Sequence, residues 1–324
     1  MENELVFVPT TPASGEILPA GLFAPTPKAA ERAAEFFTAQ INNPHTRKAY
    51  LNATRRFAAW CAGKGIDQLA AVRPIHVAAF LEELQTMVAA PTVKQHLAAI
   101  RVLFDWLVVG HVLDVNPAHS VRGPKHIVKK GKTPVLTGEE ARLLLDSIGT
   151  ESLVGLRDRA LIGLMTYSFA RVGAVLKMQV RDYFVQGRRG HVRLHEKGGK
   201  EHEVPCHHEL EEFLDQYIAI AGIGEDQSGP LFRTSTGRSG KLNATPMYQQ
   251  DVFRMIRRRA ARVGIETLIG NHTFRATGIT AYLKNGGSLE MAQHIANHES
   301  PRTTKLYDRR VEEITQSEVE KIRL

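Results

Sequence analysis

The sequence predicts a mainly α-helical protein of two domains, with a small antiparallel β-sheet in the second domain. Three observations predict this fold class. Apolar residues recur at helical spacing through residues 28–118, and glycine-rich turns separate short strand-like stretches between residues 181 and 205. Helical patterning then resumes and continues towards the C-terminus. The chain has 324 residues, which is enough for two domains with a core each.

Composition and charge narrow the classes of function. Hydrophobic residues make up 43% and charged residues 23% of the chain, as in ordinary folded proteins. The formal net charge of +8 favours a polyanionic partner, either nucleic acid or an acidic membrane surface. No apolar run is long enough for a membrane span, and the N-terminus lacks the basic region of a secretory signal. Cys61 and Cys206 form no CxxC pair, which argues against a disulfide framework or structural zinc. We therefore expect a cytoplasmic protein.

The first domain is expected to be helical and to span residues 28–120. Residues 1–27 hold five prolines and little periodicity, so we expect a mobile extension there. Asn43, which a proline follows, is typical of a capped helix start, and further helices are expected around Ile75 and after Pro91. On these residues alone, a plain bundle with solvated lysines is favoured over a DNA-binding domain. The outward basic residues that could contact DNA are Arg47, Lys48, Lys94 and Arg101.

A basic linker is expected between the domains, at residues 121–134. The segment VRGPKHIVKKGKTP contains glycine, proline and no acidic residue, a composition typical of an extended linker. An extended basic chain can follow a phosphate backbone, where each neutralised phosphate releases counterions. The alternative is a solvated tether whose lysines touch nothing. The basic residues of the linker are Arg122, Lys125, Lys129, Lys130 and Lys132.

The second domain is expected to span residues 135–324 and to mix helices with strands. Thr137 and Glu140 form the capping-box pattern of a helix start. Apolar spacing predicts further helices at residues 153–165, 207–222 and 247–264. Alternating stretches predict strands at residues 181–185, 191–195 and 202–205. We expect an irregular loop before the helix at 247–264, and that helix carries Arg257 and Arg258 as candidate DNA contacts.

A stretch near the C-terminus, residues 272–308, contains side chains that suit phosphodiester chemistry. Such chemistry needs a nucleophile, cationic donors for the phosphoryl oxygens and an acid for the leaving oxygen. The stretch offers tyrosine, arginine and histidine, and it lacks the carboxylate cluster that metal-dependent nucleases use. The adjacent Cys206, His207 and His208 could suggest a metal, but neighbouring histidines at a helix start are more often surface residues. We expect no metal site.

The order and spacing of residues in this stretch resemble the C-terminal signature of the tyrosine recombinase family, also called phage integrases. His272 and Arg275 are three residues apart, His298 follows 23 residues later, and Tyr307 follows after nine more. A lone HxxR pattern would be weak, whereas the ordered set at these spacings is specific.

Motifs upstream extend the resemblance to about residues 30–310. The segment RDRALIGLMTYSFARVGAVLKMQVRDY resembles the family's first arginine box, which gives Arg171 as the first catalytic arginine. The segment LHEKGGKEHEVP resembles the β-hairpin that carries the family's catalytic lysine, here Lys197. The segments NPHTRKAYLNATRRFAAWC and TVKQHLAAIRVLFDWLVVGHVLDVNP resemble the N-terminal core-binding, SAM-like domain. The second domain would then be the mixed α/β catalytic domain of the family.

The resemblance implies a site-specific recombinase that cleaves and rejoins DNA strands without metal or ATP. Tyr307 would attack the scissile phosphate and form a 3′-phosphotyrosyl link, and Lys197 would protonate the leaving 5′ oxygen. The residues that would bind the phosphate are Arg171, His272, Arg275 and His298. The implied partners are double-stranded DNA with paired recombinase sites, a homotetramer on the synapsed DNA and accessory DNA-bending proteins, in a bacterial cytoplasm. The C-terminal tail could dock on a neighbouring subunit or pack on its own.

The sequence departs from the family's pattern at three places. Many members have an acidic residue three positions after the first arginine, and here that position is Ala174. Phe169 and Ala170 replace the usual small residues before the arginine. Ala296 and Asn297 replace the usual leucine and glycine before the second histidine. None of these changes removes a catalytic atom.

Alternatives remain at both the residue and the function level. Each catalytic candidate could have a plain structural role, and Lys200 is a rival to Lys197 for the role of acid. A type IB topoisomerase-like enzyme that relaxes DNA would share the chemistry. A catalytically silent DNA-binding relative would keep the basic faces without cleaving.

Overall fold

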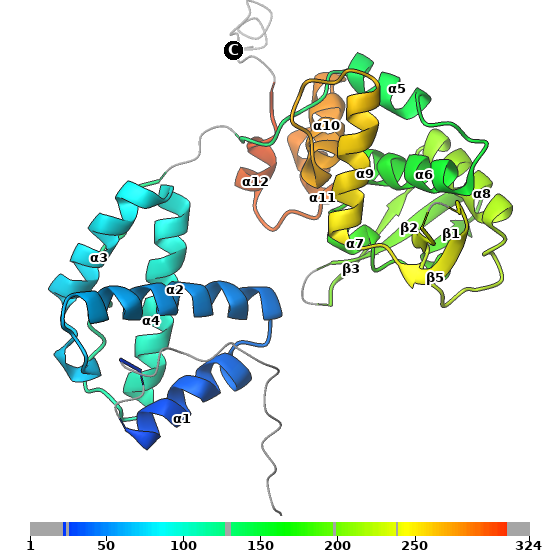
Figure 1. The fold of residues 1–324 in the computed structure, drawn as a ribbon. Coiled ribbons are helices and arrows are strands. Elements are labelled where there is room, and N and C mark those ends of the chain that lie inside the picture. The colour runs from blue at the N-terminus through cyan, green and yellow to red at the C-terminus, as the bar shows by residue number, and fades with distance from the viewer. Residues whose placement is uncertain (1–21, 24–25, 127–130, 197–198, 238, 310–324) are drawn as a thin grey trace, which may run out of the picture. The chain divides into compact units, whose positions relative to one another are not determined.

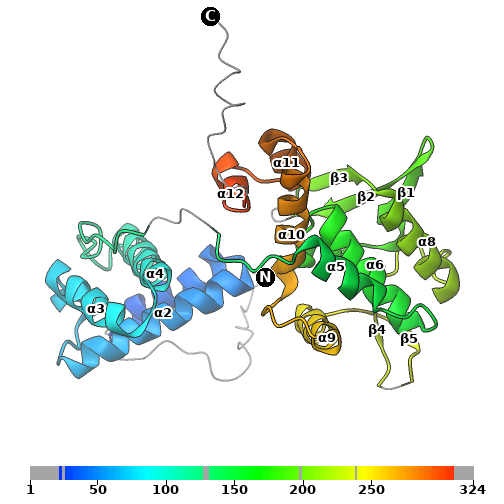
Figure 2. The ribbon, with the colours of Figure 1, turned by 90° about the horizontal axis from the view of Figure 1, so that it is seen from above.

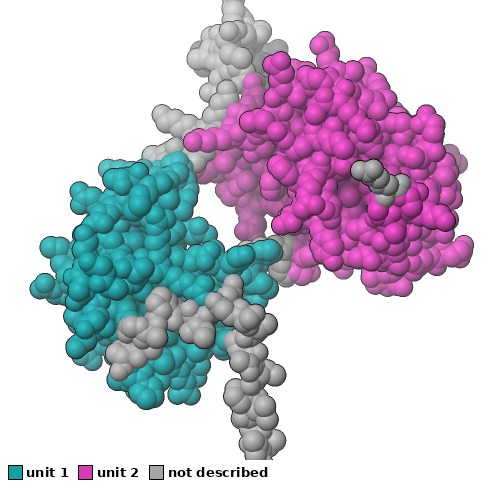
Figure 3. Space-filling view, in the orientation of Figure 1, with its two compact units in different colours: residues 1–127 teal, residues 128–324 magenta. Residues whose placement is uncertain are grey.

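The computed structural model describes residues 22–23, 26–126, 131–196, 199–237 and 239–309. The chain divides into two compact units, residues 1–127 and 128–324, each with a hydrophobic core of its own (Figure 3). The expected C-terminal tail and most of the expected mobile extension lie outside the described residues, as do Lys129, Lys130 and Lys197. Within the described part of the chain, no helix is both long and apolar enough to cross a membrane.

The first unit is a helical bundle whose helices start where the sequence predicts them (Figure 1). Proline stands in the first turn of each of the four α-helices described in this unit, where its missing N–H costs no hydrogen bond. The Asn43 side chain accepts hydrogen bonds from the N–H groups of His45 and Thr46, which confirms the predicted cap. The elements are α1 (Pro27–Glu35), the π-helical turn η1 (Phe36–Gln40), α2 (Pro44–Gly63), η2 (Leu69–Ala71), α3 (Pro74–Met87) and α4 (Ala90–Val109).

The core of the first unit includes residues that precede the expected domain start. Leu22 and Phe23 are buried, and the Phe23 ring lies 6.4 Å from that of Phe104 on α4. The Phe57 ring on α2 packs edge-on against Phe104 as well. Leu22 and Phe23 were expected in the mobile extension, but this apolar pair packs into the bundle.

The second unit combines helices with two small antiparallel sheets, in agreement with the predicted fold class. Thr137 caps α5, and Glu140 completes the predicted capping box. The elements up to the middle of the unit are α5 (Gly138–Asp146), α6 (Leu153–Tyr167), α7 (Val172–Val175), η3 (Val180–Asp182), β1 (Tyr183–Gln186), β2 (Arg189–His195), β3 (Glu201–Pro205) and α8 (His208–Ala221). They continue with β4 (Arg233–Ser235), β5 (Leu242–Pro246), α9 (Gln249–Arg262), α10 (Asn271–Lys284), α11 (Leu289–Ile295) and α12 (Pro301–Lys305).

The predicted strands form one three-stranded sheet of order β1-β2-β3, with both pairs antiparallel. His195 at the end of β2 pairs with Glu201 at the start of β3, so the turn between them spans residues 196–200. The prediction of an irregular loop before α9 is wrong in part, because β4 and β5 pair there as a second hairpin. The three residues of β4, Arg-Thr-Ser, carry no alternating apolar pattern that could have indicated a strand.

Helix α6 organises the second unit, since it packs against both α8 and α10 (Figure 2). The approach of α10 is close: a Cβ atom on Gly278 would collide with the backbone oxygen of Thr166 in α6. Only glycine permits this distance between the helices. The chain leaves α6 towards Arg171, and α10 carries His272 and Arg275, so this packing brings together candidates from distant parts of the sequence.

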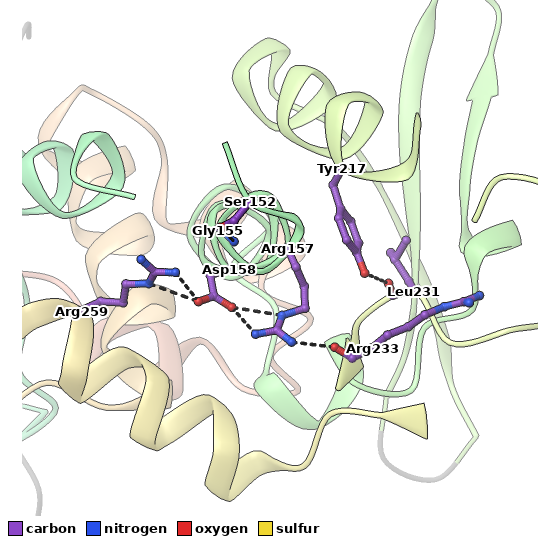
Figure 4. A network of polar contacts seen from close by, with 8 residues as sticks. All are labelled: Ser152, Gly155, Arg157, Asp158, Tyr217, Leu231, Arg233 and Arg259. Atoms are coloured by element: carbon purple, nitrogen blue, oxygen red, sulfur yellow. Dashed lines mark hydrogen bonds and ion pairs between the residues drawn. The ribbon is translucent and has the colours of Figure 1, made fainter. Parts of the chain in front are cut away.

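A buried charge network fixes α9 against α6 (Figure 4). Asp158 has no exposed surface and accepts hydrogen bonds from Arg157 at 2.7 Å and from Arg259 at 2.7 Å. Arg157 also donates to the backbone oxygen of Arg233 in β4 at 2.8 Å. Removal of Asp158 would leave buried guanidinium groups without a counter-charge, at a cost of about 3–5 kcal/mol. Arg259 therefore has a structural role, although it lies among the basic residues of α9.

Candidate active site

Arg275 is the buried centre of the site. Only 2% of its surface is exposed, and its guanidinium donates to the backbone oxygens of Phe169 and of Ala296, the latter at 2.6 Å. Burial and then the positive charge of Arg171 lower the pKa of Arg275 to about 10, while Tyr307 acts in the opposite direction. Arg275 thus stays charged at neutral pH and lies beside both Arg171 and Tyr307.

Phe169 connects α6 to this centre through an unusual backbone conformation. Its φ angle is 53°, in the left-handed region that bulky residues rarely adopt. The conformation directs its carbonyl to Arg275, and its buried ring joins a small cluster with Ile279 and Leu283, against which Tyr307 packs. The large residue that departs from the family's usual small one therefore has a packing function. The sequence did not indicate that its backbone oxygen is part of the site.

Arg171 forms an ion pair that sequence reasoning missed. It is the N-cap residue of α7, and its Nη1 atom lies 2.8 Å from Oε2 of Glu196. The arginine side chain is 40% exposed, whereas the glutamate side chain is only 7% exposed. The one signal for Glu196 in the sequence is its position directly before Lys197.

His272 lies one turn before Arg275 on the same face of α10. Much of its side chain remains exposed. Desolvation, and then the positive charges of Arg275 and Arg171, lower the pKa of His272. The neutral imidazole is therefore favoured, and it can both donate and accept hydrogen bonds.

His298 and Tyr307 lie next to each other, with their rings stacked. His298 is buried, and its Nδ1 atom lies 2.9 Å from the hydroxyl of Thr304, which is itself fully buried in α12. The hydroxyl of Thr280 on α10 donates to the backbone oxygen of Tyr307 at 2.9 Å. The segment with the tyrosine is thus fixed to the helix that carries His272 and Arg275.

Asn297 explains how the chain does without the family's usual glycine before the second histidine. Its φ angle is 47°, and it follows the C-cap residue of α11. Helices commonly end in a left-handed residue, for which asparagine is the main substitute for glycine. The turn directs the carbonyl of Ala296 to Arg275 and places His298 next to the centre.

The lysine candidates lie in the turn between β2 and β3. Lys197 is outside the described residues, so its assignment stays a prediction. The backbone N–H of Glu196 donates to the carbonyl of Lys200 at 2.8 Å and closes the turn. Lys200 is exposed, and its Nζ atom lies 3.2 Å from the carboxylate of the exposed Glu299. Together with Arg171, Glu196 and His298, Lys200 lines an open cleft of the second unit.

The described end of the linker contacts the tyrosine segment. Gly131 donates its backbone N–H to the carbonyl of Leu306 at 3.0 Å, directly before Tyr307. Arg309 donates to the carbonyls of Gly131 at 2.5 Å and Thr133 at 3.2 Å. This part of the linker is therefore attached to the second unit and supports the chain on both sides of the tyrosine.

The candidate DNA contacts fall into two groups. Arg47 donates to the carbonyl of Ile41 at 2.9 Å, and Arg101 donates to that of Ala118 at 3.0 Å, so both have structural roles in the first unit that the sequence did not indicate. The DNA contacts of all these residues stay predictions. The candidates with exposed side chains are Lys48, Lys94, Arg122, Lys125, Lys132, Arg257 and Arg258.

The cysteines and the histidines next to Cys206 make packing contacts. Cys61 and Cys206 are both free and buried, and burial raises the pKa of the Cys206 thiol to about 12. The ring of His207 stacks on that of Tyr167 at 4.5 Å. In the described part of the chain, no group of three or more His, Cys, Asp or Glu side chains could hold a metal ion.

The arrangement as a whole suits phosphoryl transfer with a tyrosine as the nucleophile. Arg171, His272 and His298 lie near Arg275, and Arg275 and His298 lie beside the phenol of Tyr307. Guanidinium groups match the oxygens of a phosphate in geometry and charge. An enzyme of this class cleaves a phosphodiester by transferring it to its own tyrosine.

Comparisons with known proteins agree with this class. Residues 134–313 match the family model "Phage integrase family", and residues 30–112 match "Phage integrase, N-terminal SAM-like domain". The chain therefore belongs to the phage integrase family, and it is a tyrosine recombinase, an enzyme of site-specific DNA recombination that cleaves and rejoins DNA strands.

Individual relatives span most of the chain. "Tyrosine recombinase XerC" of Pelobacter propionicus is 30% identical over 268 residues, which cover 82% of this chain and 84% of the relative. "Tyrosine recombinase XerD" of Chlorobaculum tepidum is 28% identical over 291 residues, covering 87% and 92%. Among solved structures, XerH site-specific recombinase bound to palindromic difH substrate has a TM-score of 0.68 at 17% identity, covering 91% of this chain and 87% of that chain. A lambda integrase dimer bound to a COC′ core site has a TM-score of 0.67 at 18% identity, covering 88% and 79%. At these identities the structural likeness concerns the fold.

Proposed function

We propose that Tyr307 is the nucleophile of this recombinase. Its phenolic oxygen forms a bond to the scissile phosphorus while the bond to the 5′ oxygen breaks, which gives a 3′-phosphotyrosyl link and a free 5′ hydroxyl. Lys197 donates the proton that the leaving 5′ oxygen takes up. The 5′ hydroxyl of a partner strand then attacks the phosphotyrosine and releases the enzyme. One phosphoester replaces another at each step, so the bond energy is kept without ATP.

Four cationic or hydrogen-bonding side chains stabilise the transferring phosphoryl group in this proposal. Arg171 and Arg275 bind the non-bridging oxygens, where charge develops during the transfer. His272 assists them as a neutral hydrogen-bonding group, and His298 places the phosphate next to Tyr307. The observation that best supports this proposal is that Arg275, which is buried and charged, lies beside both Arg171 and Tyr307.

The substrate of the proposed reaction is double-stranded DNA with paired recombination sites. The neighbours in solved structures include a lambda integrase tetramer bound to a Holliday junction, which supports a homotetramer on synapsed DNA for this chain as well. The net charge of +8 supports binding to a polyanion. Accessory DNA-bending proteins would assist the assembly, and the reaction takes place in the bacterial cytoplasm.

A suicide substrate tests the proposal. This duplex carries a nick next to the scissile phosphate, so the short leaving fragment diffuses away and traps the covalent complex. We expect a protein–DNA adduct on a denaturing gel and, with an intact partner site, strand exchange. Relaxation of supercoiled DNA without strand exchange would favour a topoisomerase-like enzyme. Site binding without any adduct would leave only a silent DNA-binding protein.

A further inference from the structure

Glu196 is a buried carboxylate in a site that otherwise collects positive charge. Its side chain is 7% exposed, and its Oε2 atom lies 2.8 Å from Nη1 of Arg171. A buried carboxylate costs desolvation free energy, and it would also repel a phosphate. Its presence in a cleft lined by Arg171, Lys200 and His298 therefore needs a specific explanation.

The position of Glu196 in the fold links two catalytic elements. It directly follows β2 and directly precedes Lys197, and its backbone N–H closes the turn by donating to Lys200 at 2.8 Å. Its side chain reaches Arg171 at the start of α7. Helix α7 itself provides no acid, since its residues are Val, Gly, Ala and Val, and Ala174 is buried. The same residue thus contacts Lys200 through its backbone and Arg171 through its side chain.

Arg171 can bind a phosphate and keep its hydrogen bond to Glu196 at the same time. A guanidinium group has five N–H donors, and the hydrogen bond to Glu196 uses only the Nη1 group. The Arg171 side chain is 40% exposed, so other donors can face a ligand in the cleft. We propose that Glu196 is a positioning residue that orients Arg171 towards the scissile phosphate and ties this arginine to the end of β2. The proposal rests on the proposed function of Arg171.

The opposite role makes a different prediction. If Glu196 only masked Arg171 and competed with the phosphate, its removal would strengthen phosphate binding and speed cleavage. If it positions Arg171, its removal slows cleavage, because catalytic groups displaced by about 1 Å can lose about a hundredfold in rate. Affinity for the uncleaved site should hardly change, because DNA binding rests on many contacts.

The experiment measures single-turnover cleavage of the nicked suicide duplex by the full-length protein. We expect Glu196→Ala to cleave about a hundredfold more slowly than wild type. Glu196→Gln keeps the shape and an oxygen that accepts the hydrogen bond, so its rate should lie between the two. Glu203→Gln is the matched control, because this exposed carboxylate on β3 pairs with Arg193 at 2.9 Å instead. Its rate should equal that of wild type.

Two further measurements separate positioning from a general loss of structure. In a double-mutant cycle, Glu196→Gln should add little to Arg171→Ala, since a residue that acts through the arginine has no effect without it. A scissile methylphosphonate carries no negative charge and needs the arginine less, so the penalty of Glu196→Gln should shrink on it. A structural defect would slow both substrates alike and would add to the effect of Arg171→Ala.

The proposal is overturned by wild-type or faster cleavage in both Glu196 variants, or by additive effects in the cycle. Failure of the proposed function is recognised separately. In that case the wild-type protein would form no tyrosine-linked adduct on the suicide duplex at all, whatever residue stands at position 196.

Discussion

The imidazole ring of His298 lies parallel to the phenol ring of Tyr307, with 5.7 Å between the ring centroids and an angle of 7° between the planes. The Nδ1 atom of the imidazole forms a hydrogen bond with the hydroxyl of Thr304 at 2.9 Å. The stacked ring limits the positions that the phenol can adopt. Because Nδ1 bonds Thr304, Nε2 is the ring nitrogen that would form a hydrogen bond with a phosphate. In the proposed mechanism the histidine thereby acts on both the nucleophile and the group it attacks.

The buried imidazole gives a testable pH dependence of stability. Burial, and then the charges of Arg275 and Arg171, lower the pKa of His298 from 6.5 to about 3. Between these values the unfolded chain binds a proton at this position and the folded protein does not. The neutral His298 therefore does not weaken the fold above pH 6.5. As the pH drops from 6.5 towards 3, this group lowers the free energy of unfolding by up to about 1.4 kcal/mol per pH unit. Urea unfolding at pH 4–7 should show a shallower pH dependence for His298→Gln than for wild type. Parallel curves for the two proteins would contradict the assigned pKa.

The contact between Gly131 and Leu306 predicts that the linker end affects catalysis. A Cβ atom on Gly131 would lie 2.5 Å from the backbone oxygen of Leu306, so Gly131→Ala must displace the chain next to Tyr307. We expect cleavage to slow by about tenfold to a hundredfold, with site affinity kept. Gly138→Ala is the control, since nothing lies within 4 Å of a Cβ there. Equal cleavage rates for both variants would show that this contact does not support the tyrosine.

The proposed DNA contacts of the basic segment at residues 121–134 predict a change in the salt dependence of DNA binding. Phosphate contacts carry little sequence information, and each contributes about 0.9 to the log–log slope of affinity against salt. Replacement of Lys129, Lys130 and Lys132 by glutamine should weaken specific and random DNA similarly. The slope should become shallower by roughly one unit for each phosphate that the linker no longer neutralises.

Fluorescence-anisotropy titrations across a salt series measure this slope. The control for the lower net charge is a triple glutamine variant of other exposed lysines, Lys64, Lys241 and Lys284. A slope that stays at the wild-type value in the linker variant would identify the linker as a solvated tether.

The proposed role of Lys197 as acid predicts rescue by a better leaving group. Lys197→Ala should slow cleavage of a normal phosphodiester, because the departing 5′ oxygen needs a proton. A 5′-bridging phosphorothiolate should restore the rate, since sulfur leaves without protonation. Lys200→Ala serves as the comparison, and single-turnover cleavage of both substrates provides the rates. If the rescue occurs at Lys200 and not at Lys197, the acid has been misassigned.

Sequence patterns predicted the elements that local chemistry determines. Asn43 and Thr137 mark helix starts because a cap depends on residues only three or so positions away. The strands of the β1–β3 sheet were predictable because their alternation and glycine turns are local signals. The β4–β5 hairpin was missed because its short strands take their conformation from pairing and not from a pattern of their own.

Contacts between residues that are far apart in the chain could not be predicted from the sequence. The pair of Arg171 and Glu196 is 25 residues apart and joins a helix start to a hairpin. The carbonyl of Phe169 reaches Arg275 across 106 residues, through a left-handed backbone that no motif announces. Likewise, Arg101 was expected on an outer basic face, but the carbonyls of Ala118 and Val121 engage it. Such roles follow only from the packing of whole elements.

The covalent link between the phenol of Tyr307 and DNA is the step on which the proposed mechanism depends. The direct measurement is a denaturing gel of full-length protein on the nicked suicide duplex, with mass spectrometry of the DNA-linked peptide. Tyr282→Phe is the matched control, because Tyr282 packs in the same apolar cluster as Tyr307. We predict an adduct on Tyr307 in wild type and in the control, and none in Tyr307→Phe, which should still bind the site. An adduct that persists in Tyr307→Phe, or a linked peptide without residue 307, would contradict this mechanism.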